Sequence, residues 1–520
     1  MSRRLIRSGL TVSSMTLLSR LLGLLRDMVI ANVVGAGPSA DLFLFANRIP
    51  NFLRRLFAEG AFSQAFVPIL TEYQQREDPQ IIRQFIQRVA GTLGGVITLV
   101  TLGLMLLSPL ITSLFAFGWF VEWWRDGVQA TYYPLASQLL RITFPYLGFI
   151  TLIAFSGAVL NSLGRFSIAA FSPVLLNLAI IGCALWLTPY FTEPAFALAI
   201  GVFLGGLLQL LFQLPFLRRV GLLVWPRWDW QDIGVRRIRQ LMLPALLGVS
   251  VNQITLLVNT AIASFLQVGA ISWLYYADRL VELPLGLIGA TLVTILLPTL
   301  ARLQAQTNPK QFRATIDWGL KMVVLLGIPA VIGLLLLAEP IILLIYRHGK
   351  FTLTDLEATT AALYALATGI FPLLAAKVFS CGYYARQDIR TPVRYALWTM
   401  SSHLLFNILA WPFGYVGLAL ASALSGAVNA TLLYHGLARH KIYCVTQTTA
   451  QILLRLLLAS AGMASALYLL TPERSCWLAM PFIQRLGWLA ALIAGASLLY
   501  GLLLSLLGIR KRQLSIAWSE

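Results

Sequence analysis

The chain has 520 residues, of which 58% are hydrophobic and only 11% are charged, and its mean hydropathy is +0.78. This composition excludes a soluble globular protein and indicates a membrane protein that crosses the bilayer many times. The formal net charge of +19 first suggests a nucleic-acid partner, but the basic residues fall in alternate connections, as the positive-inside rule expects. We therefore expect no nucleic acid partner.

Apolar segments long enough to cross a bilayer follow one another along the whole chain. A spanning helix needs about 20 mainly apolar residues, and these runs lack the alternating polarity of a membrane barrel. The sequence therefore predicts an all-α polytopic membrane protein with about fourteen transmembrane helices. The expected ranges are 9–34, 41–70, 84–115, 131–160, 167–188, 194–217, 237–265, 270–301, 314–346, 356–384, 392–411, 415–437, 450–470 and 483–508.

Basic residues predict the orientation of these segments. Arginines and lysines are frequent before the first segment, after the last one and in every second connection, and the opposite connections are nearly free of them. Both termini are therefore expected in the cytoplasm, in agreement with an even number of spans. Because the first segment carries Arg20, Arg26 and Asp27 and no small-residue cleavage site follows it, we expect no cleavable signal peptide.

Charged side chains lie inside segments that are otherwise apolar. An ionised group at membrane depth costs roughly 2.5 to 3.5 kcal/mol on insertion scales, so such groups usually face a cavity or a partner. Helical spacing places them on polar stripes within the segments 9–34, 41–70 and 270–301. The arginines are Arg20, Arg26, Arg54, Arg55 and Arg279, and the acids are Asp27, Asp41, Glu59, Asp278 and Glu282.

These arginines are the candidate substrate-binding residues. Arginine is the side chain best shaped for two-point contact with phosphate or carboxylate oxygens. The excess of arginine over acid in the first two segments favours a cavity for an anion such as a pyrophosphate, with the acids as gates or as groups that orient the arginines. The alternative is that the acids neutralise the arginines in buried ion pairs that fix helix register.

The sequence carries no clear signal of metal binding, disulfide bonding or ATP hydrolysis. The four cysteines and four histidines have no metal-ligand spacing, so we expect neither a metal site nor a disulfide framework. No G-x-x-x-x-G-K-[ST] loop for ATP hydrolysis is present. We therefore expect a transporter with no catalytic residues and no cofactor.

Weak internal symmetry suggests two lobes. The stretch 60–70 resembles 289–300 with one residue inserted, and a polar stretch follows each. The expected organisation is an N-terminal lobe over 1–220, a C-terminal lobe over 221–441, and two further helices with a cytoplasmic tail over 442–520. Chance recurrence of such patterns in apolar sequence is the alternative.

Several motifs resemble one known family. They are the long run 51–68 (NFLRRLFAEGAFSQAFVP), the run 272–280 (SWLYYADRL), the run 384–392 (YARQDIRTP) and Ser13 to Thr16 with Arg26-Asp27. Together they are similar to the MurJ family, formerly MviN, within the multidrug/oligosaccharidyl-lipid/polysaccharide exporter superfamily. The resemblance runs from about residue 8 to beyond 440 and weakens over the last two segments.

The resemblance implies a fold and a function. The expected fold is two six-helix lobes in a V around a central cationic cavity, with two C-terminal helices bordering a groove for a lipid tail. The expected function is a flippase in the bacterial inner membrane that moves lipid II from the inner to the outer leaflet by alternating access, for peptidoglycan synthesis, cell-wall biogenesis and cell shape. The family's cavity arginines correspond to the five arginines named above, and Asp27, Asp41 and Glu282 match its acidic positions.

The remaining expectations concern partners and energy. Lipid II, membrane phospholipids and proteins of cell-wall synthesis or division are the expected partners. The membrane potential is a plausible drive, at about 2.3 kcal/mol per charge and 100 mV. The coupling ion is open, because the segment 237–265 offers Asn252, Gln253 and Asn259 but no acid for a sodium site.

Alternative functions are also compatible with the sequence. One is a flippase for another polyprenyl-pyrophosphate-linked saccharide, and another is a drug or cation antiporter of the same superfamily, although the latter would favour carboxylates over arginines in its cavity. A scaffold without transport would tolerate loss of the arginines. A membrane glycosyltransferase would need an acidic metal motif, which we do not find.

Overall fold

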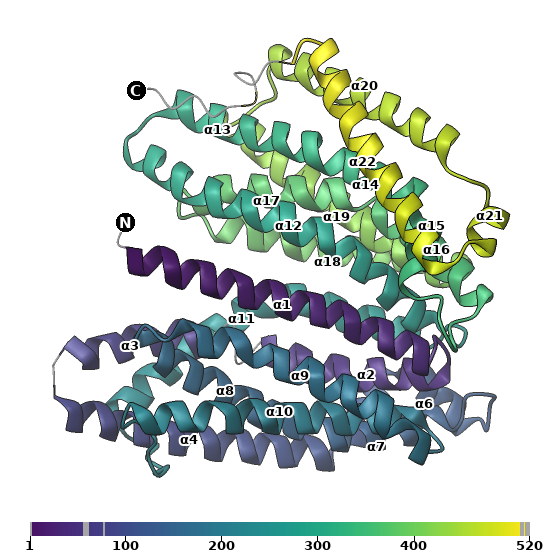
Figure 1. Cartoon of the computed structure of the whole chain (residues 1–520). Helices are drawn as coiled ribbons and strands as arrows, with labels where there is room; N and C mark the ends of the chain where they lie inside the picture. Colours follow the sequence, from purple (N-terminus) through teal and green to yellow (C-terminus); the bar gives the residue numbers. More distant parts are fainter. Residues whose placement is uncertain (1–2, 56–61, 76–77, 510–513, 515–520) are drawn as a thin grey trace. The chain divides into compact units, whose positions relative to one another are not determined.

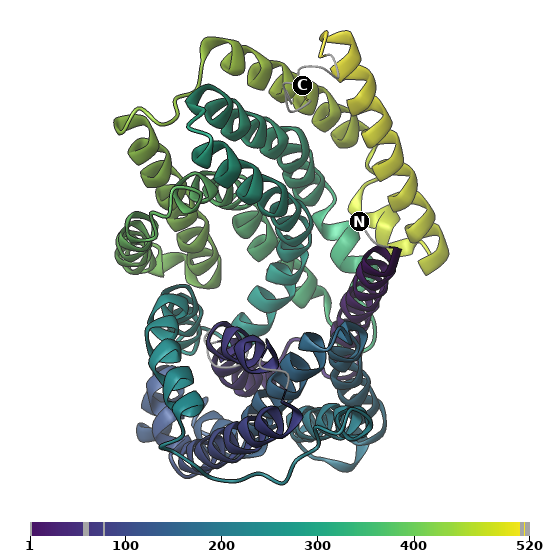
Figure 2. The same cartoon turned by 90° about the vertical axis from the view of Figure 1, so that its left-hand side faces the viewer.

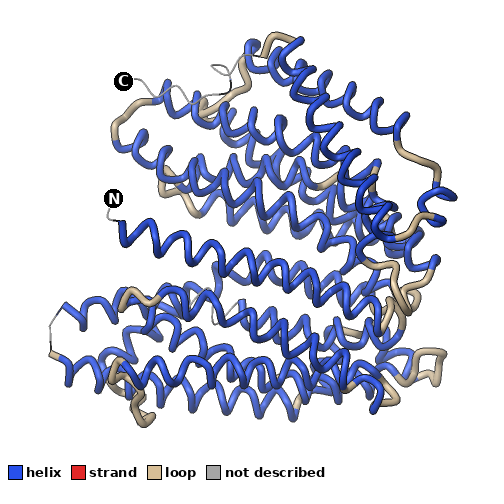
Figure 3. Tube along the Cα trace, in the orientation of Figure 1, coloured by secondary structure: helices blue, strands red, loops and turns tan. Residues whose placement is uncertain are grey.

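The computed structural model describes residues 3–55, 62–75, 78–509 and 514. Helices make up most of these residues, and within the described ranges no strand is present (Figure 3). The chain folds into two compact units. Unit 1 comprises Met1–Ser272 with His348–Phe351, and unit 2 comprises Trp273–Arg347 with Thr352–Glu520.

Unit 1 is built from long helices joined by short connections (Figure 1). Its elements are α1 (Arg3–Val33), α2 (Pro38–Arg54), α3 (Ser63–Gln75), α4 (Pro79–Leu106), α5 (Ser108–Phe115), α6 (Phe117–Trp124), α7 (Tyr132–Thr143), α8 (Pro145–Ser162), α9 (Phe166–Trp186), the 3-10 turn η2 (Thr188–Tyr190), α10 (Pro194–Arg219) and α11 (Ile233–Ala263). The helix α12 (Ala270–Ala305) begins in unit 1 and continues into unit 2.

Unit 2 holds the remaining helices. They are α13 (Pro309–Met322), the π-helical turn η3 (Val323–Gly327), α14 (Ile328–Leu336), α15 (Ala338–Ile345), α16 (Leu353–Ala367), α17 (Ile370–Tyr384), α18 (Arg390–Leu409), the 3-10 turn η4 (Trp411–Phe413), α19 (Gly414–Arg439), α20 (Gln447–Leu470), α21 (Arg474–Ala479) and α22 (Phe482–Leu506).

The helices confirm the prediction of an all-α polytopic membrane protein. Each predicted segment overlaps one or more helices, and among the described residues ten helical spans are long and apolar enough to cross a membrane. The segments covered by α1, by α2 with α3, by α11 and by α18 are helical but are not among those ten. Polar and charged side chains lower the apolar character of α1 and α2, and these side chains are the ones that suggested a site.

Small residues let α9 and α10 approach closely in unit 1. A Cβ atom added at Gly201 would lie 3.0 Å from the Cα atom of Ile180, and one added at Gly205 would lie 2.6 Å from Cδ1 of Leu176. In lipid, such close approach supplies the van der Waals contact that holds helices together. Helix α9 also packs against α1, and Figure 1 shows it between α1 and α10. This packing places Asn177 of α9 beside Arg26 of α1.

In unit 2, α19 packs against α16, α17 and α18, while α20 and α22 pack against each other as the yellow-green and yellow pair of Figure 2. Leu456 and Ile452 of α20 form a buried cluster with Val324 of η3. The Tyr500 hydroxyl of α22 donates a hydrogen bond to the Leu325 carbonyl oxygen at 3.1 Å. The π-helical turn therefore offers both an apolar surface and a carbonyl group to the last two long helices.

A buried carboxylate ties α13 to the start of α20. Asp317 accepts hydrogen bonds from the Tyr443 hydroxyl at 3.0 Å and from the Thr449 hydroxyl at 2.8 Å, and Lys321 Nζ lies 2.8 Å from its Oδ2. Burial, followed by the nearby charge of Asp317, raises the pKa of Tyr443, which lies in the connection between α19 and α20. The tyrosine therefore stays a neutral donor, and the carboxylate is well satisfied.

The compact units and the predicted lobes divide the chain at different places. Helix α11, which the sequence places in the C-terminal lobe, packs against α3, α4, α5 and α6 and belongs to unit 1. The helices α20 to α22, which the sequence sets apart as an appendage, belong to unit 2. The lobe boundaries at 220 and 441 rest on internal sequence symmetry and stay a prediction.

Candidate functional site

Arg26 of α1 is held by two neighbours. Its Nε and Nη2 atoms donate to Asp27 Oδ1 at 3.0 and 2.7 Å, and its Nη1 donates to Asn177 Oδ1 of α9 at 3.2 Å. The Asn177 amide donates in turn to the Ser19 carbonyl oxygen at 3.2 Å. The Arg26 side chain is 11% exposed and that of Asp27 only 1%. Arg26 is therefore a preorganised, partly neutralised cation whose direction is fixed by α9.

Arg20 differs from Arg26, although both lie on α1. Its side chain is exposed, as are those of Leu17 and Leu21 on either side of it, whereas Asp27 is buried. The polar stripe predicted for this helix therefore has two environments. Its Asp27 end is buried, and its Arg20 end leaves the guanidinium accessible.

Helix α2 carries an anchoring part near its start. Asp41 is 3% exposed and accepts hydrogen bonds from the backbone N–H groups of Gly269 at 2.6 Å and Ser272 at 2.8 Å, and from the Ser272 hydroxyl. A carboxylate in this position caps the first turn of α12 and complements its helix dipole. In the second half of α2, Arg48 Nη1 donates to the buried Thr260 hydroxyl of α11 at 2.7 Å. These two side chains join α2 to other parts of unit 1.

The end of α2 presents the other two predicted arginines. Arg54 Nε donates to Asn51 Oδ1 at 3.3 Å, and the Asn51 amide donates to the Asn47 carbonyl oxygen at 2.8 Å. Arg55 directly follows the helix as its C-terminal cap residue and is exposed. Glu59, the predicted acidic member of this stripe, lies outside the described residues.

Arg279 of α12 sits beside an acid and an aromatic ring. Its Nη1 lies 2.9 Å from Glu282 Oε2 one turn along the helix, and its guanidinium carbon lies 5.5 Å from the ring centre of Tyr275. The side chains of Arg279 and Glu282 are 34% and 46% exposed, so solvent screens this pair. Asp278 is half-buried. The guanidinium is thus oriented by contacts on two sides while remaining accessible.

The predicted arginines are divided between the units. Arg20, Arg26, Arg54 and Arg55 belong to unit 1, and Arg279 belongs to unit 2. It stays a prediction that these arginines line one cavity and that each contacts the substrate.

Lys377 is a cation inside a membrane span that was not among the predicted site residues. Lys377 lies in the middle of α17, and its Nζ atom is 3.4 Å from the Leu285 carbonyl oxygen of α12. A Cβ atom added at Gly289 would lie 2.9 Å from the same nitrogen, so α12 makes room for the lysine there. A lone lysine in an otherwise apolar run was a readable signal, because ionisable groups at membrane depth are usually functional. Lys377 lies on the same helix pair as Arg279.

Comparison with known proteins identifies the family. The family profile described as "Lipid II flippase MurJ" matches residues 30–486. A probable lipid II flippase MurJ from Haemophilus influenzae is 53% identical over 96% of this chain and 99% of its own length. One from Vibrio cholerae is 51% identical over 99% of this chain and 98% of its own.

Solved structures agree with that family. A structure of "Lipid II flippase MurJ, inward closed conformation" aligns with a TM-score of 0.76 and 27% identity, covering 95% of this chain and 98% of that one. An inward-facing multidrug transporter of the MATE family aligns with a TM-score of 0.68 over 83% of this chain, and its 14% identity shows a shared fold alone. The chain therefore belongs to the MurJ family of lipid II flippases.

Proposed function

We propose that this protein translocates lipid II from the inner to the outer leaflet of the bacterial cytoplasmic membrane, for peptidoglycan synthesis and cell-wall biogenesis. The observation that carries the proposal is similarity over almost the whole chain to flippases of this family, at 53% and 51% identity. The protein is a transporter, and no covalent chemistry is required of it.

The arginines would hold the pyrophosphate of the substrate. A guanidinium already directed by protein contacts loses less conformational freedom on binding, which favours affinity. Arg26 has such contacts from Asp27 and Asn177, and Arg279 has them from Glu282 and Tyr275. In this proposal Asp27 and Glu282 orient the arginines, and Arg20, Arg54 and Arg55 add positive charge along the path.

Two further side chains have separate roles in the proposal. Lys377 supplies a cation next to α12 in unit 2. Asp41 holds two helices together, because its three hydrogen bonds fix the first turn of α12 on α2. A conformational change that separates these two helices has to break the three bonds.

The proposed cycle is alternating access, in which the lobes rock about the bound headgroup while the polyprenyl tail stays in lipid along α20 and α22. The membrane potential is the proposed drive, and the coupling ion is left open. Both termini are proposed to be cytoplasmic. Phospholipids surround the protein, and proteins of cell-wall synthesis or division are its proposed partners.

The test uses bacterial cells depleted of their own flippase and expressing this protein. We expect growth to be restored, with no accumulation of untranslocated lipid II, and we expect an Arg26→Ala variant of equal membrane abundance to fail. A Lys310→Ala variant, which changes an exposed lysine of α13, serves as the control and should restore growth. Failure of the wild-type chain, with transport of another polyprenyl-linked saccharide or an organic cation instead, would reject the substrate.

A further inference from the structure

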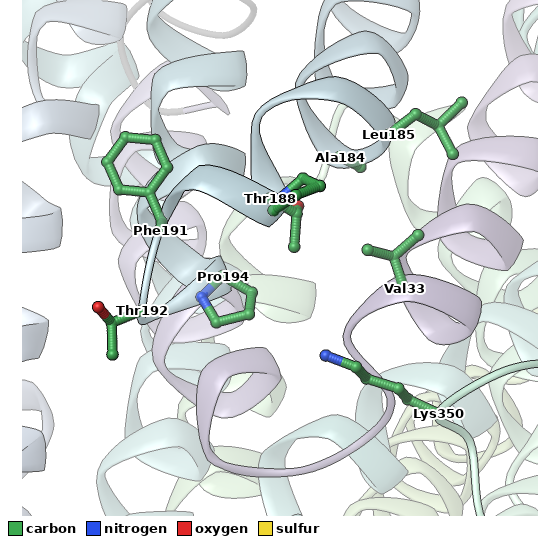
Figure 4. Close-up of a pocket in the computed structure, with 9 residues that line it drawn as sticks. Val33, Ala184, Leu185, Thr188, Phe191, Thr192, Pro194 and Lys350 are labelled. Carbon is green, nitrogen blue, oxygen red and sulfur yellow. The ribbon is translucent and has the colours of Figure 1, made fainter.

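A pocket opens within unit 1 at the ends of α1, α9 and α10 (Figure 4). Its volume is about 380 Å³, and its apolar walls include Val33, Leu185, Phe191 and Pro194. Lys350 and Thr188 are among its polar lining groups. By the alternation of basic connections, the α9–α10 connection and the connection that carries Lys350 are both expected on the outer side of the membrane.

Lys350 is held at this pocket by a tight backbone fit. The short loop His348–Phe351 packs with unit 1, and the Lys350 N–H donates to the Asn32 carbonyl oxygen at 2.9 Å. Gly35 has a φ of +83°, and a Cβ atom there would lie 2.9 Å from the Lys350 carbonyl oxygen. Gly349, with a φ of +56°, would place a Cβ atom 2.0 Å from Asn32 Oδ1. Figure 4 shows that the ammonium group of Lys350 points into the pocket.

Thr188 supplies a second polar group. The residue is 8% exposed, and within the described part of the chain its Oγ1 atom is buried and has no hydrogen-bond partner. A buried hydroxyl without a partner is costly, so natural proteins retain one mainly where something else satisfies it.

The acid closest in sequence to the pocket is already engaged. Glu193 follows Thr192 of the pocket wall, and its Oε2 atom accepts a hydrogen bond from the Ser39 hydroxyl at 2.9 Å. Lys350 is exposed, and the part of the chain that the structure describes shows no ion pair to it. The pocket thus combines an ammonium group with an apolar wall, and a buried hydroxyl without a partner belongs to one of its lining residues.

We propose that this pocket binds the head of an anionic amphiphile from the outer leaflet, with its phosphate on Lys350 and Thr188 and its first hydrocarbon groups against Val33, Leu185 and Phe191. A volume of about 380 Å³ is near the lower end for ligand sites, so it takes a phosphate with a few adjoining carbons rather than a whole disaccharide headgroup. Two lipids share this chemistry: an anionic phospholipid and a polyprenyl pyrophosphate. The proposal does not depend on lipid II being the transported substrate.

Native mass spectrometry of the full chain tests the proposal with three probes: phosphatidylglycerol, undecaprenyl pyrophosphate and the zwitterionic phosphatidylcholine. We expect Lys350→Gln to weaken binding of one or both anionic lipids about tenfold, as loss of a charge-assisted hydrogen bond does, and to leave phosphatidylcholine unchanged. If Lys350→Gln loses binding of phosphatidylglycerol alone, the pocket is a phospholipid site. If it loses binding of undecaprenyl pyrophosphate alone, the pocket is a subsite for a polyprenyl carrier. Lys310→Gln is the charge-matched control, and equal binding of both anionic lipids by the control and by Lys350→Gln would overturn the proposal.

A Thr188→Val variant separates a ligand group from a structural one. Valine has nearly the same shape but no hydroxyl, so it removes the buried group that has no partner in the lipid-free protein. We expect a melting temperature equal to or above that of the wild type, together with weaker binding of the anionic lipid. A lower melting temperature with unchanged lipid binding would show that the hydroxyl has only a structural role, and would overturn its part in the site.

Discussion

Asp41 and Gly269 are 228 positions apart in the sequence, yet Asp41 Oδ2 accepts a hydrogen bond from the Gly269 backbone N–H at 2.6 Å. The other carboxylate oxygen accepts from Ser272, so both oxygens serve the first turn of α12. Asp41, an acid inside a predicted membrane segment, thus has a structural role, and this role is compatible with a second one in gating.

Replacing this carboxylate should destabilise the protein. We expect Asp41→Ala to reduce the free energy of unfolding by about 2 kcal/mol or more, because a helix loses its cap and buried N–H groups lose their acceptor. Ser272→Ala, which removes only the hydroxyl bond, should cost about 1 kcal/mol. Thermal unfolding of the purified variants measures both, and equal melting temperatures for Asp41→Ala and the wild type would exclude the cap.

The contact between Arg26 and Asn177 predicts coupling between α1 and α9. Arg26→Lys keeps the charge but cannot reach Asp27 and Asn177 with a planar fork, so it should translocate lipid II less well than the wild type. Arg26→Ala, Asn177→Ala and the double variant should show an interaction energy of about 0.5 kcal/mol or more in thermal unfolding. If the stability effects of the two single variants are strictly additive, the hydrogen bond between Arg26 Nη1 and Asn177 Oδ1 contributes nothing to stability.

The close approach of α9 and α10 makes Gly201 a sensitive position. A methyl group there meets the Ile180 backbone at 3.0 Å, so we expect Gly201→Ala to cost about 1 to 3 kcal/mol through overpacking. Gly103 of α4 is the matched control, since a Cβ atom there meets nothing within 4 Å and alanine favours a helix. Gly103→Ala should therefore be neutral or stabilising. Equal thermal stability of the two variants would contradict this packing.

Asp388, in the connection between α17 and α18, predicts a dependence on pH. Burial alone would raise its pKa, but hydrogen bonds from Thr391 and the charge of Arg386 outweigh burial and lower it. A carboxyl group with a lowered pKa contributes stability above its unfolded value, near 4, and loses it as the pH falls through the folded value. We expect the melting temperature to fall less between pH 7 and pH 3 for Asp388→Asn than for the wild type. Identical dependence of the melting temperature on pH in the two proteins would show that Asp388 contributes nothing to the pH dependence of stability.

Much of the fold could be predicted because hydropathy is a local property. The positions of α9, α10, α19 and α22 follow from apolar runs of the required length. The short helices α6 and α21 were missed because their lengths, 8 and 6 residues, are too small for a membrane span to reveal them.

The candidate site was less predictable, because its contacts are not local. Helical spacing places Asp27 near Arg26, but nothing in the sequence pairs Arg26 with Asn177 or Asp41 with Gly269. Lys377 was readable as a charge in an apolar run, yet its place beside Leu285 depends on the packing of α17 on α12. The pocket at Lys350 depends on two glycines with positive φ in different connections.

The most direct measurement of the central claim is the amount of lipid II that becomes accessible to an externally added lipid II-cleaving enzyme, in cells whose only flippase is this protein. We compare the wild type with Arg279→Ala and with Glu282→Gln at equal membrane abundance. If Arg279 holds the pyrophosphate, its alanine variant should lose most of the signal, while Glu282→Gln, which breaks only an exposed pair worth about 1 kcal/mol or less, should retain more of it. Full translocation of lipid II by Arg279→Ala would contradict the claim that Arg279 holds the pyrophosphate.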